Sequence, residues 1–423
     1  MGRTRRLRLK RKHSVRSLNM DNELTTINLT KWLVDNNWRN DTNLRLRGFP
    51  ETGRGVTSSR QIKENDILIA VPCDLMITYN TLQENLQEMI SPRSHGLKIH
   101  DLLTLFLMNE KRKDKSLWRA YMDSLPSELP LLPWLAPTRE INLYPLDLRI
   151  ISEKTHETFT ESMSRVKKSI SKVDGCVFDE NLFKWGYVLV NTRAVYFDPK
   201  IVKSNQQLLE NVLIDQPSMA LCPFLDMFNH HFLAMTEAEA VEKEGKLVYR
   251  LKTFTEYKRY DQIFISYGSH DNIKLLMEYG FFIPGNNLDV VVYDLQNLLD
   301  VFSPNLDQKR YKFIMDHGFN SDLYIGYLGI SFNLKAVLFV FFCEQIQDYS
   351  AVIFSDIYPE DFLLTMSGWI LELLDYKLTI FESDYNKLKD CGLAKSGNAK
   401  LMEDFLKYRT VLVNDLRNKL CIQ

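Results

Sequence analysis

The stretch LCPFLDMFNHH, Leu221–His231, sets one aspartate, one asparagine and two adjacent histidines among apolar residues. Three interpretations are open at this point: a metal site, part of a catalytic site, or a structural turn. Asp226 and His230 have the i, i+4 spacing of a metal pair on a helix, and His231 adds a third donor. Adjacent histidines, however, project in different directions, and no HExxH motif accompanies them. We therefore expect no metal here.

Size and composition indicate a globular protein with several domains. The 423 residues are 45% hydrophobic and 25% charged, with a net charge of -1. Residues 1–20 hold eight lysines and arginines and no acid, which predicts a disordered tail or a nuclear-import or nucleic-acid contact signal. No apolar segment follows this basic start, so we expect no secretory signal. The longest apolar run, Ala336–Cys343, is too short to span a bilayer. The six scattered cysteines predict reduced thiols, as in the cytosol or nucleus.

The segments around the opening stretch predict a mixture of strands and helices. Helical patterns occur at Asn28–Asn36, Asp101–Glu110 and Glu153–Lys172, and short apolar or alternating runs predict strands at Leu247–Phe254 and Gln262–Tyr267. In Phe49–Pro72 a glycine-rich turn, a β-branched run, the turn KEND and the run DILIAV predict a hairpin. From Val290 to Gln423 apolar residues recur at helical spacing, which predicts a separate helical module.

Four segments carry a more specific signal: GRG (Gly53–Gly55), NTRAVYF (Asn191–Phe197), FLDMFNHH (Phe224–His231) and FISYGSHDNIKLLMEYGFF (Phe264–Phe282). Each alone is weak, since a lone GRG is most often a tight turn. In this order and spacing they resemble the SET-domain methyltransferases of the Rubisco large-subunit methyltransferase-like branch. SLWRAYMDSLP (Ser116–Pro126) adds to the likeness, which runs from about residue 28 to residue 320.

The resemblance implies an α+β SET-domain fold of small β-sheets with a knotted core. It implies a basic disordered tail at 1–24 and a SET domain at 25–289 with a helical insertion at about 80–185. An all-helical substrate-binding domain at 290–423 would follow. Periodicity alone reaches only mixed β structure with a helical insertion and a helical tail.

The resemblance also implies S-adenosyl-L-methionine as the cofactor. Glycines let the backbone approach a ligand closely, and an arginine can pair with the cofactor's carboxylate. The expected cofactor-binding residues are Thr52, Gly53, Arg54, Gly55, Arg193, Asp226, Asn229, His230 and Tyr267. His231 stands where relatives usually carry serine, and no role is assigned to it.

The expected reaction is methyl transfer to the ε-amine of a protein lysine, histone or non-histone. A free lysine is protonated at neutral pH, and an apolar channel beside a sulfonium disfavours that charge. Tyr267 is the expected catalytic residue, orienting the amine and the methyl donor. Tyr279, Phe281 and Phe282 are expected to line the substrate channel, the alternative for each being ordinary core packing.

Two alternatives keep the fold and change the activity: a catalytically inactive SET-fold binding protein, and a protein-histidine methyltransferase. The presence of Tyr267, Asn229, His230 and the GRG turn together favours an active enzyme. We expect a monomer in the cytoplasm, the nucleus or both, with no membrane contact and no direct nucleic-acid binding beyond the basic tail.

Overall fold

The computed structural model describes residues 17–86, 90, 96–170, 178–201, 211–243, 245–343, 348–390 and 397–422. Residues 1–16, most of the expected basic tail, lie outside the described residues. The chain divides into two compact units: unit 1 from residues 1–130 and 155–268, and unit 2 from residues 131–154 and 269–423. The division after Gly268 differs from the boundary expected near residue 290, because Leu276 and Met277 are buried in the same core as the C-terminal helices.

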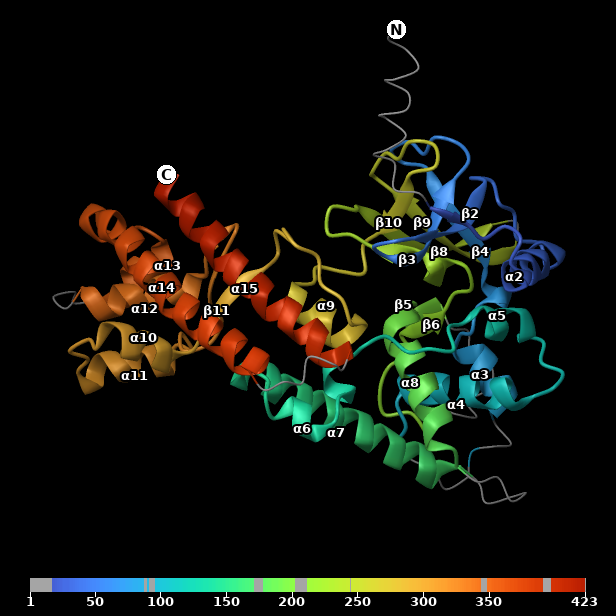
Figure 1. The fold of residues 1–423 in the computed structure, drawn as a ribbon, viewed down its shortest axis with the longest axis horizontal. Helices are drawn as coiled ribbons and strands as arrows, with labels where there is room; N and C mark the ends of the chain where they lie inside the picture. The colour runs from blue at the N-terminus through green and yellow to red at the C-terminus, as the bar shows by residue number, and fades with distance from the viewer. Residues whose placement is uncertain are drawn as a thin grey trace, which may run out of the picture. The chain divides into compact units, whose positions relative to one another are not determined.

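Unit 1 contains three small sheets (Figure 1). Their strand orders are β1-β2-β3-β10-β7, β4-β9-β8 and β5-β6. The strands are β1 (Leu18–Asn19), β2 (Leu44–Phe49), β3 (Gly53–Ser58), β4 (Ile67–Pro72), β5 (Ala194–Tyr196), β6 (Met219–Leu221), β7 (Asn229–His230), β8 (Thr236–Lys243), β9 (Lys246–Thr253) and β10 (Gln262–Ile265). In β2 the alternation of leucine and arginine buries Leu44 and Leu46 and leaves Arg45 exposed, as the period of a strand requires.

Helices precede and interrupt these strands. They are α2 (Leu24–Asp35), α3 (Tyr79–Leu86), α4 (Ile99–Arg112), α5 (Arg119–Ser124) and α8 (Glu180–Arg193), with short 3₁₀ turns η1 (Cys73–Leu75), η3 (Pro199–Ile201) and η4 (Leu225–Met227). Helix α7 (Leu146–Ser169) contributes residues to both units. The Asp179 side chain caps α8 by accepting from the main-chain N–H groups of Asn181 and Leu182. This helix ends at Arg193 and so fixes where that residue lies.

The predicted hairpin within Phe49–Pro72 is wrong. β3 pairs with β2 on one side and with β10 on the other, so neither edge is open to β4. β4 instead pairs antiparallel with β9, for example Ala70 with Arg250. The KEND turn does form, since Asp66 N–H donates to the Lys63 carbonyl at 3.1 Å. It carries the chain into another sheet, and a local pattern cannot indicate a partner strand so distant in sequence.

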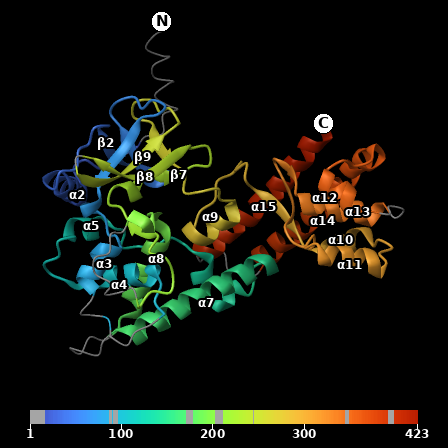
Figure 2. The same ribbon diagram turned by 180° about the vertical axis from the view of Figure 1, so that it is seen from behind.

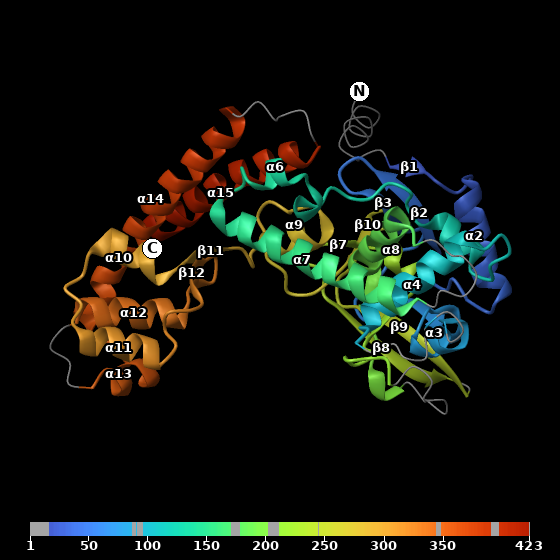
Figure 3. The same cartoon turned by 90° about the horizontal axis from the view of Figure 1, so that it is seen from below.

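Over its described residues, unit 2 is helical apart from a small antiparallel sheet of order β11-β12-β13. Its elements are η2 (Pro133–Leu135), α6 (Thr138–Ile141), α9 (Asn272–Tyr279), β11 (Val290–Tyr293), α10 (Leu295–Phe302), α11 (Gln308–Asp316), β12 (Leu323–Gly326), β13 (Gly329–Ile330), α12 (Phe332–Phe342), α13 (Tyr349–Ser355), α14 (Glu360–Asp390) and α15 (Gly397–Ile422). Helices α10 to α13 gather beside α14 (Figure 2), and α14 and α15 lie side by side (Figure 3). Helix α12 is buried almost all round, as its apolar sequence predicts.

The two units together confirm the predicted mixed α+β fold. Among the described residues, no helix is both long enough and apolar enough to cross a membrane. Cys73, Cys222 and Cys343 are free thiols.

Candidate functional site

The opening stretch Leu221–His231 forms a buried 3₁₀ turn followed by a short strand. Phe224 begins the turn with a φ of 71°, and its ring lies 5.1 Å from that of Trp38. Asp226 lies in η4 and His230 in β7, so the two do not share a helix face. Over the ranges that the structure describes, no group of three or more histidine, cysteine or acidic residues has a metal-binding arrangement.

Strand β7 pairs with β10 in parallel, with Asn229 opposite Phe264 and His230 opposite Ile265. The chain leaves β10 two residues before Tyr267, so this pairing brings Tyr267 back onto the end of β7. The family resemblance predicts that both segments belong to one site, and the strand register accounts for their proximity.

Tyr267 is held by three contacts with the segment around β7. Its hydroxyl donates to the main-chain oxygen of Phe228 at 2.7 Å, and its main-chain N–H donates to Nδ1 of His230 at 3.1 Å. The rings of His230 and Tyr267 stack with centroids 5.1 Å apart. Because an amide N–H can only donate, Nδ1 of His230 is the acceptor in this contact.

The turn Thr52–Gly55 lies against Asn229. The amide Nδ2 of Asn229 donates to the main-chain oxygen of Arg54 at 3.0 Å and lies 3.4 Å from that of Thr52. Gly53 has a φ of 68°, a left-handed conformation that favours glycine. A Cβ on Gly55 would lie 2.6 Å from Nε2 of Gln262 and 2.9 Å from Nδ2 of Asn229. The backbone conformation thus favours glycine at position 53, and the lack of room for a side chain favours it at position 55.

Arg193 and Asp226 form a buried ion pair. Nη1 of Arg193 donates to Oδ2 of Asp226 at 3.1 Å and to the Asp226 main-chain oxygen at 3.0 Å. The Asp226 side chain is 0% exposed and that of Arg193 is 17% exposed. The hydroxyl of Tyr121 donates to the same Oδ2 at 2.9 Å. Oδ1 of Asp226 and Nε of Arg193 are buried without a hydrogen-bond partner.

Arg54, a second arginine, adds positive charge to the part of the site around Asp226. Burial and the nearby Arg193 lower the pKa of Arg54, and Asp226 only partly offsets them. Burial also opposes the charge of Arg193, but Asp226 and smaller contributions outweigh it, so its pKa is raised. Arg193 forms the ion pair with Asp226, and Arg54 interacts with the same carboxylate only at longer range. The surplus positive charge, in a site of low dielectric, favours an anionic ligand group.

The three expected channel residues lie in unit 2. Tyr279 has its ring 6.2 Å from His270 and 6.1 Å from Phe281, and burial, with Glu278, raises the pKa of Tyr279 to about 12. Phe282 is partly buried and packs against the core of this unit, with its ring 5.3 Å from that of Phe405 and 5.4 Å from that of Tyr408. The channel role of all three residues stays a prediction.

His231 closes the turn that follows β7. Its Nδ1 accepts from the Leu233 N–H at 3.2 Å, and its ring lies 4.6 Å from that of Phe232. Burial lowers the pKa of His231, which keeps the ring neutral and able to accept. In this contact the imidazole acts as a turn-capping acceptor.

Sequence reasoning missed two residues that shape the site. Tyr121 holds Asp226, and Gln262 exchanges hydrogen bonds with the hydroxyl of Thr52 at 2.8 and 3.1 Å. Tyr121 lies within SLWRAYMDSLP, so the one available signal was the family likeness of that segment.

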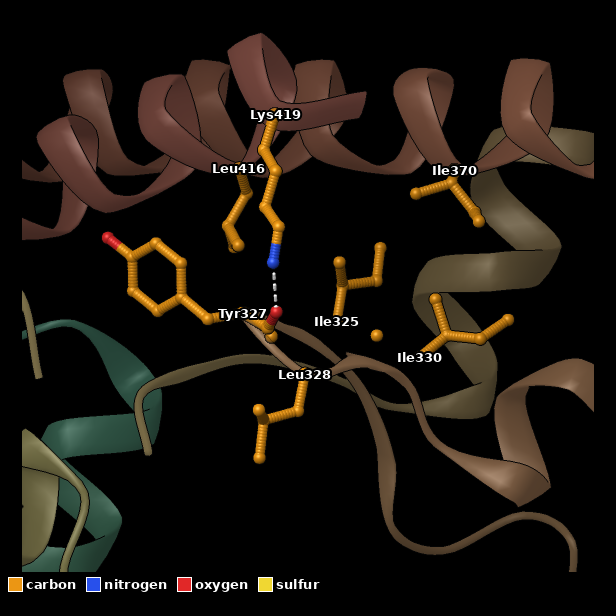
Figure 4. Close-up of a pocket in the computed structure, with 9 residues that line it drawn as sticks. Ile325, Tyr327, Leu328, Ile330, Ile370, Leu416 and Lys419 are labelled. Atoms are coloured by element: carbon orange, nitrogen blue, oxygen red, sulfur yellow. Dashed lines mark hydrogen bonds between the residues drawn. The ribbon is translucent and has the colours of Figure 1, made fainter. Parts of the chain in front are cut away.

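Unit 2 also contains a cavity of about 170 Å³ between the β12–β13 hairpin and helices α14 and α15 (Figure 4). The ammonium of Lys419, from α15, donates to the main-chain oxygen of Tyr327. The other lining residues are aliphatic or glycine, namely Ile325, Gly326, Leu328, Gly329, Ile330, Ile370 and Leu416. This lining offers no carboxylate, imidazole or thiol for catalysis.

Comparison with known proteins agrees with this geometry. Residues 53–268 match the SET domain family. The chain is 31% identical to SET domain-containing protein 4 of Mus musculus over 80% of this chain and 77% of the relative. It is 25% identical to a ribosomal lysine N-methyltransferase of Schizosaccharomyces pombe over 68% of each chain. The fold is similar to the SET domain of LSMT bound to methyllysine and AdoHcy, with a TM-score of 0.60, 16% identity, and coverage of 94% of this chain and 91% of that one.

Proposed function

Because this chain belongs to the SET-domain family, we propose that it is an S-adenosylmethionine-dependent protein-lysine N-methyltransferase. One observation carries the proposal: the parallel pairing of β7 with β10 places Tyr267 against His230, while Asn229 of the same strand holds the turn Thr52–Gly55. Lysine as the acceptor is supported by the ribosomal lysine methyltransferase among the relatives and by the methyllysine in the solved structure.

The residues present fit the cofactor. S-adenosylmethionine carries a carboxylate and, when bound, supplies an electrophilic methyl group on a sulfonium. The two guanidinium groups beside Asp226 leave a positive charge that suits the carboxylate. The turn Thr52–Gly55 and the main chain of Asn229 and His230 would hold the rest of the amino-acid and adenosine parts. Asp226 acts indirectly in this assignment, because it is fully buried and bonded to Arg193.

Tyr267 would orient the lysine amine. Its hydroxyl donates its proton to the Phe228 carbonyl, so its oxygen would act as the acceptor for an N–H of the incoming amine. Methyl transfer needs alignment more than proton transfer, and a hydroxyl fixed at both ring and oxygen supplies it. An apolar substrate channel would disfavour the charged ammonium, which leaves the neutral amine to react, and Tyr279 and Phe281 stay the residues predicted for that channel.

Two measurements test the proposal. Isothermal titration calorimetry of the purified chain with S-adenosylmethionine tests cofactor binding, and absence of binding would refute the enzymatic assignment. Incubation with labelled cofactor and cell extract, followed by mass-spectrometric mapping, identifies the acceptor. Methyl-lysine is the expected product. Methyl-histidine would correct the acceptor, and binding without any transfer would favour the inactive binding protein.

A further inference from the structure

Helix α5 contacts two separate segments of the candidate cofactor site. From this helix, the Tyr121 hydroxyl donates to Oδ2 of Asp226 at 2.9 Å. Nη1 of Arg54 donates to the main-chain oxygen of Ser124, the last residue of α5, at 2.7 Å. Since Arg54 lies in the Thr52–Gly55 turn and Asp226 in η4, one short helix connects both.

Packing fixes α5 in place. Tyr121 is 0% exposed and Ser124 is 4% exposed. The ring of Trp118, which precedes the helix, lies 6.0 Å from Phe106 and 5.6 Å from Trp32. The contacts that α5 makes with the site are therefore made by a rigid element.

The contacts form a chain from Tyr121 to the arginine. Oδ2 of Asp226 accepts from both the Tyr121 hydroxyl and Nη1 of Arg193, so the tyrosine fixes the carboxylate that in turn fixes the guanidinium. Burial and then Asp226 raise the pKa of Tyr121 well above its ordinary value, so its hydroxyl stays protonated and remains a donor. Nε of Arg193 has no partner within this network.

We propose that Tyr121 is a positioning residue for cofactor binding, which acts through Asp226 to orient Arg193 while α5 holds Arg54 through Ser124. The inference rests on the proposed function and adds a residue that touches neither cofactor nor substrate. Its consequence is specific: loss of the Tyr121 hydroxyl weakens binding of the cofactor and leaves turnover at saturating cofactor nearly unchanged.

The first test is calorimetric titration of Tyr121→Phe with S-adenosylmethionine and with S-adenosylhomocysteine. Loss of a buried hydrogen bond to a charged group predicts a Kd raised roughly tenfold for both. We expect the KM for the cofactor to rise in parallel and kcat to stay within about twofold of wild type. The matched control is Tyr249→Phe, which loses a buried tyrosine bond to the Tyr196 main-chain oxygen, 2.8 Å long, and should keep the wild-type Kd.

A double-mutant cycle tests the route through Asp226. If Tyr121 acts through that carboxylate, Tyr121→Phe combined with Asp226→Asn binds no more weakly than Asp226→Asn alone. Additive losses, or an unchanged Kd in Tyr121→Phe, would overturn the inference and leave the proposed function intact. If Tyr121→Phe does not fold, Asp226→Glu is the substitute, because it displaces the carboxylate and leaves Tyr121 in place. An unchanged Kd for the cofactor in Asp226→Glu would also overturn the inference. Failure of the wild-type chain to bind the cofactor would overturn both proposals.

Discussion

The hydroxyl of Tyr267 lies 2.7 Å from the main-chain oxygen of Phe228, to which it donates a hydrogen bond. Because the Tyr267 ring also stacks on His230, neither the ring nor the hydroxyl is free to turn. The contact depends on the main chain of Phe228, which precedes β7, and not on a side chain. Only changes to Tyr267 itself or to the β7–β10 pairing can remove it.

Tyr267→Phe should therefore slow methyl transfer strongly while preserving cofactor binding. The phenylalanine ring keeps the stacking on His230 but offers no lone pair to the amine. Loss of one preorganised polar contact in a reacting site lowers kcat by roughly 10²–10³-fold. Labelled-methyl incorporation measures the rate, and calorimetry measures the Kd, which should stay within about threefold of wild type.

Tyr257→Phe is the matched control for that change. Its hydroxyl also donates to a main-chain oxygen, that of Phe264 at 2.9 Å. Tyr257→Phe should lower the stability of the fold about as much as Tyr267→Phe does, and it should leave turnover unchanged. Equal turnover by wild type and Tyr267→Phe would remove Tyr267 from the catalytic role.

Asn229→Asp should weaken cofactor binding by separating β7 from the Thr52–Gly55 turn. The amide of Asn229 donates to the Arg54 main-chain oxygen at 3.0 Å, and a carboxylate would instead face carbonyl oxygens. The lost bond and the new repulsion predict a Kd raised about tenfold or more. The surface change Asn414→Asp, which removes an amide bond to the Thr410 oxygen, is the control. A wild-type Kd in Asn229→Asp would show that the turn is held independently of β7.

Gly55→Ala should weaken cofactor binding, whereas Gly368→Ala should stabilise the fold. A Cβ on Gly55 meets the amides of Gln262 and Asn229 at 2.6 and 2.9 Å, so both must move and the Asn229 contacts weaken. Gly368 lies within α14 with no heavy atom within 4 Å of a Cβ. Alanine there should stabilise the helix by about 0.5–1 kcal/mol. Thermal unfolding and cofactor titration separate the two, with lower affinity expected only for Gly55→Ala.

Local patterns were sufficient for the helices and insufficient for strand pairing. The predicted segment 101–110 lies in α4, because apolar spacing reports directly on a buried helix face. The predicted segment 153–172 lies in α7 up to Ser169, and its residues 171–172 are outside the described residues. Strand β4 was assigned to a hairpin although its partner β9 begins at Lys246. A pattern in one strand says nothing about which distant strand completes its hydrogen bonds.

The candidate site was predictable only in part for the same reason. Tyr267, Asn229 and the GRG turn were found because their motifs resemble a family, and the β7–β10 register then supplied the geometry. Tyr121 contacts Asp226 across a separation of 105 residues, and its sequence context offers no signal beyond the family likeness of SLWRAYMDSLP. The role of such a residue is visible only once the carboxylate it serves has been placed.

Asp289→Asn should change the pH dependence of stability. The buried Asp289 carboxylate accepts from Asn272 N–H at 2.6 Å, from Asn272 Nδ2 at 2.7 Å and from the Tyr408 hydroxyl. These neutral donors lower the pKa of Asp289, but burial has the larger effect and raises it to about 6. Between about pH 4 and 6 the folded state thus binds more protons than the unfolded state, and stability falls as pH rises. The ionised group costs up to about 3 kcal/mol above that window.

Urea unfolding of wild type and Asp289→Asn at intervals from pH 4 to 7 measures this effect. The stability of the variant relative to wild type should rise with pH across the window and then level off. Asp307→Asn is a useful comparison. The Arg310 N–H lowers the pKa of that exposed carboxylate, so stability from Asp307 is lost as pH falls. A flat difference between wild type and Asp289→Asn would contradict the raised pKa.

His100→Phe should change the pH dependence of stability in the opposite sense to Asp289→Asn. Burial lowers the pKa of His100 to about 4, and its Nε2 lies buried without a partner. Its ring packs 4.3 Å from that of Tyr187, a contact that phenylalanine can keep. Between about pH 4 and 6.5 the unfolded state binds the proton that the folded state excludes, so wild-type stability rises with pH through this window. Removing the imidazole removes that rise, so the stability of the variant relative to wild type should fall as pH increases from 4 to 6.5. Parallel wild-type and His100→Phe profiles would show that His100 does not stay neutral in the folded state.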